Sequence, residues 1–202
     1  MNPTVTYVSP TVGIILLLGF GVGMLIVTLL FGRASDQTTR TGFLVAGRNI
    51  GWLLGGCSIA ASWIWAPALF ISSQIAYQKG LAGVFWFTVP NVLALAMFAW
   101  LAPAVRTNFP EGYTLPQYIR QRLGSDRVHK VYLFPFFFYQ LMAVTVQLYA
   151  GGNFVSLLTG ISLTIVMPLM AAIALGYTWI SGLSASIVTD LIQMLLLSLI
   201  HI

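Results

Sequence analysis

The 59 residues from Val131 to Thr189 contain no Lys, Arg, Asp or Glu, and this charge-free run limits the fold more than any other feature of the sequence. Soluble domains carry roughly 25% charged residues, whereas this chain of 202 residues carries 6% and is 58% hydrophobic. Several apolar stretches also reach the roughly 18 residues expected of a membrane span. The sequence therefore predicts an all-α polytopic membrane protein embedded in a lipid bilayer.

Turn-forming residues divide this apolar chain into separate spans. Glycines such as Gly80 and Gly182 can break a helix or adopt a positive φ. We expect six spans, near 11–31, 51–78, 80–105, 131–157, 161–180 and 183–202. The first is longer than the roughly 7 to 15 apolar residues of a signal peptide, so we expect it to remain as a helix. The whole chain, 1–202, is predicted to form a single membrane domain.

Basic residues indicate how these spans are oriented. Eight of the nine lie in two connections, 32–50 and 106–130, and with six spans both connections fall on the same side. The positive-inside bias makes that side cytoplasmic, so we expect a multi-pass protein of the plasma or inner membrane with its N-terminus outside. The net charge of +5 has the same origin. Nucleic-acid binding is not expected without a soluble basic module.

The second connection contains a compact helix signal from Thr114 to Gly124. Thr114 can cap the helix, Gln117 can close a capping box and Gly124 can end the helix. One face would meet the bilayer surface, and the arginines would point toward water and anionic headgroups. We interpret this segment as a structural, interfacial helix.

The second span contains a mid-membrane proline within Cys57–Leu69. Pro67 removes a backbone donor and is expected to disrupt the helix around residues 63–67. Carbonyls freed at membrane depth are tolerated only where protein or a cavity surrounds them, and a desolvated sodium ion needs such oxygens. A simple proline kink and an ion site both remain open from the residues alone.

Asp190 is the single acidic residue of the apolar final third of the chain. A lone carboxylate in a span is costly, so it should face a hydrated cavity or a partner, as part of an ion pathway or as a gate. A structural hydrogen bond to a neighbouring span is the alternative.

Three local patterns resemble the sodium:solute symporter family. They are Phe43–Trp52 at the entry to the second span, the loop helix Thr114–Gly124, and Ser181–Gln193. The resemblance covers the chain from Phe43 to Gln193. It implies one extra N-terminal helix followed by the first five-helix repeat of an inverted-repeat, leucine-transporter-type fold. We expect the second repeat to be absent from this chain.

The same resemblance implies roles for particular residues. The backbone carbonyls of Ala61 and Ile64 would form one side of a sodium site, and sodium would be the coupling ion. The missing C-terminal repeat would complete the coordination, so it is needed for function. Asp190 matches the acid associated with the cytoplasmic ion route.

The resemblance also bears on the solute. The segments Ser62-Trp63-Ile-Trp65-Ala-Pro-Ala68, Ser72-Ser73-Gln74 and Phe85-Trp86 are similar to the urea-transporting branch. A small polar solute suits an indole-lined pocket with few polar anchors. We expect Trp63, Trp65, Ala68 and Trp86 to line that pocket, with Gln74 as a polar contact toward the outside. Packing of the indoles within the spans is the alternative.

Secondary active transport is the predicted function: sodium-coupled symport of a small organic solute, urea or a similar small polar molecule, by alternating access. The alternative is a symporter-like sensory module of a signalling protein. An enzyme is not expected, because the sequence contains no Ser/His/Asp set and no Gly-rich phosphate loop.

Overall fold

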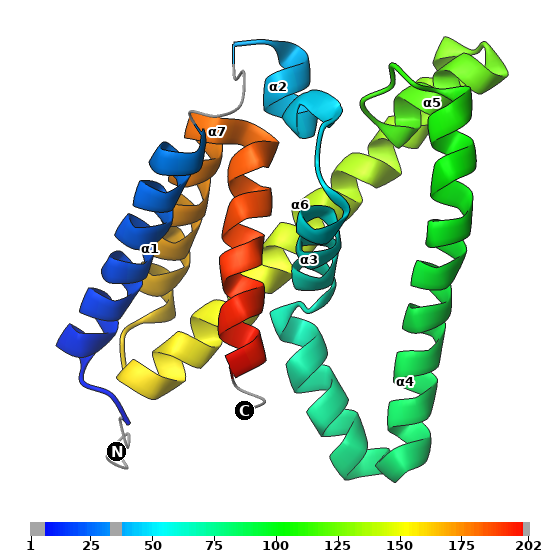
Figure 1. The fold of residues 1–202 in the computed structure, drawn as a ribbon. Coiled ribbons are helices and arrows are strands. Elements are labelled where there is room, and N and C mark those ends of the chain that lie inside the picture. The colour runs from blue at the N-terminus through cyan, green and yellow to red at the C-terminus, as the bar shows by residue number, and fades with distance from the viewer. Residues whose placement is uncertain (1–6, 33–37, 200–202) are drawn as a thin grey trace. The chain divides into compact units, whose positions relative to one another are not determined.

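The computed structural model describes residues 7–32 and 38–199, and in these ranges the chain forms helices and no strands (Figure 1). The helices are α1 (Pro10–Gly32), α2 (Arg40–Val45), the 3-10 helix η1 (Ala46–Arg48), α3 (Trp52–Trp63), α4 (Ala66–Asn108), α5 (Leu115–Leu123), α6 (Asp126–Thr159) and α7 (Leu163–Leu199). The predicted all-α class is confirmed. Residues 200–202 of the last predicted span and 33–37 of the first loop lie outside the described residues.

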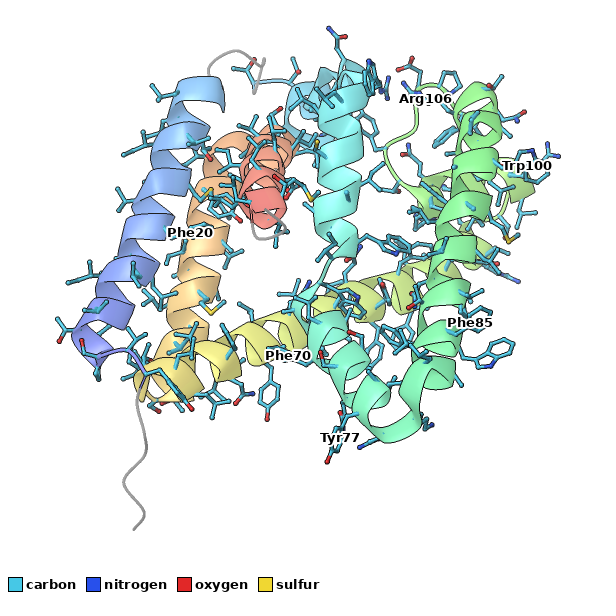
Figure 2. All side chains as sticks on the ribbon, turned by 60° about the horizontal axis from the view of Figure 1, so that its bottom comes forward. Phe20, Phe70, Tyr77, Phe85, Trp100 and Arg106 are labelled. Atoms are coloured by element: carbon cyan, nitrogen blue, oxygen red, sulfur yellow. The ribbon has the colours of Figure 1, made fainter. Side chains whose placement is uncertain are left out.

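Several of these helices are suited to a bilayer. Five helical segments in the described ranges are long and apolar enough to cross a membrane, or six if the bent pair Arg40–Arg48 and Trp52–Trp63 counts as one. Their large apolar side chains are widely exposed; Trp100, for example, is 77% exposed, and Tyr77 projects away from α4 (Figure 2). Apolar surface on this scale needs lipid or protein to cover it. The chain is therefore a multi-pass membrane protein.

The chain forms two compact units, one of residues 1–66 and 146–202 and the other of residues 67–145. In the first unit, α1 packs against α7 through small residues. A Cβ atom at Gly21 would lie 2.9 Å from Cγ2 of Ile173, so glycine allows the two helices to approach closely. Met24, Val166 and Ala185 are buried in this unit.

Helix α7 reverses its direction (Figure 1), and the reversal falls at its non-helical residue, Gly182. Gly182 has φ 58° and ψ −141°, which only glycine adopts readily. The reversal separates 163–181 from 183–199, and the second part packs along α3. The positive φ anticipated at this glycine is confirmed.

The second unit begins with a similar reversal. Gly80 has φ 62° and ψ −157° and divides α4 into 66–79 and 81–108, which fold back on each other (Figure 1). The positive φ anticipated here is also confirmed.

The predicted loop helix is present as α5 in the same unit. The Thr114 hydroxyl accepts from the Gln117 N–H at 3.3 Å, and Gly124 ends the helix at φ 61°. The expected capping box is altered, because Gln117 Oε1 accepts from the N–H of Tyr113 at 3.1 Å instead of from Thr114. The side chain reaches one residue further back and satisfies the donor just outside the helix.

Candidate functional site

The predicted break in the second span is confirmed. Helix α3 ends at Trp63, and Ile64 has φ −85° and ψ 82°. Helix α4 starts at Ala66, so Pro67 lies in its first turn. A proline is well tolerated there because the first N–H groups of a helix have no partner within it. The break is therefore a true interruption between two helices, not a bend within one.

A glutamine side chain from α6 binds the backbone on the α4 side of this break. The N–H of Ala66 donates to Oε1 of Gln147 at 3.0 Å. In a continuous helix that N–H would bond to the carbonyl of Ser62, and residue 67 would bond to the carbonyl of Trp63. Because Gln147 engages the first donor and Pro67 lacks the second, the break deprives both carbonyls of their usual helical donors. Backbone oxygens in an apolar span thus become available to a ligand.

Asp190 has a partner on α3. The Ser58 hydroxyl donates to Oδ2 of Asp190 at 2.5 Å, and both residues are half-buried. Thr189, next to the acid, is 1% exposed and donates to the Ser186 carbonyl at 2.9 Å. Ser58 precedes the end of α3 at Trp63 by little more than one turn, about 8 Å at roughly 1.5 Å per residue. The carboxylate is thus tied to the same helix that carries the break.

The first unit contains five of the residues predicted for the ion and solute sites. Ala61 is half-buried, whereas Trp63, Ile64 and Trp65 are 44%, 45% and 37% exposed. These four flank the break directly, and Asp190 is linked to α3 through Ser58. This part of the first unit contains oxygens of the type that a hard cation takes, among them the carbonyls at the break and the Asp190 carboxylate, which is bonded to Ser58.

The second unit contains the other three predicted pocket residues. Ala68 is half-buried and Gln74 is exposed. Trp86 is 71% exposed and meets Phe85 edge-on, with ring centroids 5.4 Å apart. With Ile75 and Lys79, Trp86 also lines an open hollow of about 460 Å³ beside the Gly80 turn.

Sequence reasoning missed two residues of this region, Ser58 and Gln147. Each is a polar side chain within an apolar helix, and that was the available signal. Their partners, Asp190 and Ala66, are 132 and 81 residues away in the chain.

The chain is similar to known transporters. It is 26% identical over 193 residues to "Probable urea active transporter 1" of Schizosaccharomyces pombe, covering 94% of this chain and 29% of that protein. It is 28% identical over 191 residues to "Urea-proton symporter DUR3" of Oryza sativa subsp. japonica, covering 92% and 26%. It is 29% identical over 164 residues to "Sodium/glucose cotransporter 1" of Sus scrofa, covering 79% and 24%.

These relatives are considerably longer than this chain, which spans only 24% to 29% of their length. No solved structure matches it. The model of the sodium:solute symporter family matches residues 43–201, which includes the patterns 43–52, 114–124 and 181–193. The chain belongs to the sodium:solute symporter family.

Proposed function

We propose that the protein is a secondary active transporter that couples the entry of sodium to the uptake of a small polar solute by alternating access. The observation that carries this proposal is the break between α3 and α4, where Gln147 engages the Ala66 N–H and Pro67 offers no donor. A coupled transporter needs polar backbone at membrane depth to bind an ion without its water, and the interrupted backbone at this break supports the proposal.

The ion would bind at the break and leave past the acid. In this proposal the carbonyls of Ala61 and Ile64 coordinate sodium, which prefers oxygen ligands. They neighbour the carbonyls of Ser62 and Trp63, whose usual helical donors the break removes. Asp190 lies on the ion pathway, with Ser58 holding its carboxylate. One relative is named a urea-proton symporter, so a proton is the competing ion in the test below.

For the solute we propose urea or a molecule of similar size and polarity. Two of the relatives above are named for urea and one for glucose. Trp63 and Trp65 flank the break, and their faces are partly exposed. From the sequence pattern we propose Ala68, Gln74 and Trp86 as further contacts of the solute, because a small neutral solute suits a site with few polar anchors.

The proposed architecture is the extra helix α1 followed by one five-helix repeat, with a second, inverted repeat completing the site. The much greater length of the relatives supports this. We place the N-terminus outside the cell membrane and the loops 32–50 and 106–130 in the cytoplasm, from the distribution of basic residues. The three relatives above are transporters, so they lend no support to the sensory alternative.

Uptake by the full-length protein in proteoliposomes tests this proposal. Radiolabelled urea, proline and glucose are offered under an inward sodium gradient, and separately under an inward proton gradient without sodium. We expect sodium-driven urea uptake. Uptake driven by protons alone would refute sodium coupling but not symport, and no gradient-driven uptake of any of the three solutes would refute the proposal.

Two tryptophan variants test the pocket in the same assay. Trp63→Ala should raise the KM for urea about tenfold, because it removes a large contact surface beside the break. Trp179→Ala is the matched control, since this indole is 84% exposed on α7. Equal KM values for the two variants would show that Trp63 does not line the pocket.

A further inference from the structure

An apolar groove lies in the second unit, between the C-terminal part of α4 and the start of α5. Its lining includes Phe98, Leu101, Val105, Phe109, Leu115 and Tyr118, and its volume is about 470 Å³. The rings of Phe109 and Tyr118 pack with centroids 6.0 Å apart. Arg106 also lines the groove, and its Nη1 donates to the Pro110 carbonyl at 2.7 Å.

A smaller polar hollow, of about 150 Å³, adjoins this groove. It is lined by Asn108, Tyr118, Gln121 and Arg122, and Tyr118 lines both. Neighbouring Arg120 is engaged by Asp126, with Nε 2.6 Å from Oδ1. Among the described residues, Arg122 has no ion-pair partner, so its charge is available to a ligand.

The groove follows α4 into its membrane-crossing part. Helix α4 is apolar enough to span a bilayer, and it ends at Asn108, beside the polar hollow. Phe98, at the other end of the groove, lies about 15 Å back along the helix at roughly 1.5 Å per residue. Polar side chains therefore lie at the end of the helix, and apolar side chains follow from there toward the hydrocarbon core of the bilayer. A phospholipid has the same order, with a polar headgroup followed by apolar acyl chains.

We propose that the hollow and the groove together bind one anionic phospholipid. The phosphate is held by Arg122, with Gln121 and Asn108 beside it, and an acyl chain lies along the groove. Charge complementarity favours this occupant, because the segment 106–130 carries five basic residues against two acidic ones. A free phosphate would leave the groove empty, and a zwitterionic lipid would bring its own cation beside Arg122.

Native mass spectrometry of the full-length protein tests the headgroup contact. The protein in detergent is titrated with equal amounts of phosphatidylglycerol and phosphatidylcholine, and the ratio of the retained lipids is measured. We expect phosphatidylglycerol to be preferred, and Arg122→Gln to lower the ratio about fivefold, the factor for one basic residue beside net anionic lipid. Arg127→Gln removes the same charge from outside both hollows and should lower the ratio less than about twofold.

The groove is tested without changing charge. Ala102 lines it, so Ala102→Phe should fill it and reduce retention of phosphatidylglycerol. On the unaltered protein, dioctanoyl phosphatidylglycerol should displace the long-chain lipid, whereas glycerol phosphate should not. The displacement measurement tests whether the groove binds an acyl chain even if Ala102→Phe fails to fold.

Two results would overturn the proposal. If Arg122→Gln and Arg127→Gln lowered the ratio of retained phosphatidylglycerol to phosphatidylcholine equally, the attraction to anionic lipid would be diffuse. Displacement by glycerol phosphate would indicate a site for the anion alone, in which the groove takes no part.

Discussion

A Cβ atom at Gly182 would overlap the backbone carbonyl oxygen of Phe43. The two residues belong to patterns on which the family resemblance rests, 43–52 and 181–193, and these patterns are far apart in the chain. In the first unit the start of the pattern 43–52 packs against the start of the pattern 181–193, where α7 reverses. The second part of α7 then runs beside α3 and brings Asp190 to Ser58. The close approach at Gly182 therefore helps to set the position of the acid.

We expect Gly182→Ala to destabilise the protein. The backbone conformation alone should cost about 1 to 3 kcal/mol for a residue with a Cβ, and overlap with Phe43 adds to this. The measurement is the midpoint of thermal unfolding in detergent. The control is Gly176→Ala, a helical position in the same helix with nothing within 4 Å of its added Cβ. Equal midpoints in the two variants would show that Gly182 is not held against Phe43.

We expect Gln147→Leu to loosen the start of α4. Leucine has a similar size but accepts no hydrogen bond, so the Ala66 N–H loses its partner. Loss of about 1 kcal/mol should raise hydrogen exchange of the peptide covering 64–70 several-fold. Gln147→Glu retains an acceptor, so hydrogen exchange of this peptide should be nearly as slow as in the unaltered protein. Gln140→Leu, at an exposed position of α6, is the control; if it gave the same increase, the effect would not come from the break.

We expect Ser58→Ala to lower the stability of the first unit. The substitution removes the donor to Asp190 and leaves a half-buried carboxylate with one partner fewer, at a cost of about 1 to 3 kcal/mol. The free energy of unfolding in denaturant measures this. Ser198→Ala is the matched control, because that hydroxyl donates within its own helix, to the Leu195 carbonyl at 2.8 Å. If both variants had the same free energy of unfolding, the hydrogen bond between Ser58 and Asp190 would not contribute to stability.

Local chemistry predicted the parts of this structure that depend on a few neighbouring residues. The break after Trp63, the reversals at Gly80 and Gly182, and the cap at Thr114 all follow from backbone preferences of glycine and proline and from one hydroxyl. The partners of Asp190 and Ala66 could not be predicted in this way. They depend on how helices far apart in the sequence pack, and a polar residue in an apolar run shows that a partner is needed without showing which one.

The charge of Asp190 can be separated from its hydrogen bond, and this is the sharpest test of its role. In Asp190→Asn the side chain keeps its size and an oxygen that can accept from Ser58, so the free energy of unfolding should change by less than about 1 kcal/mol. A carboxylate on an ion pathway acts through its charge, because a cation at membrane depth needs a compensating anion. Gradient-driven uptake by the full-length protein should therefore fall at least about tenfold while the protein remains folded. If uptake persists in Asp190→Asn but is lost in Ser58→Ala, the contact between α3 and α7 matters for its geometry alone, and the ion must follow another route.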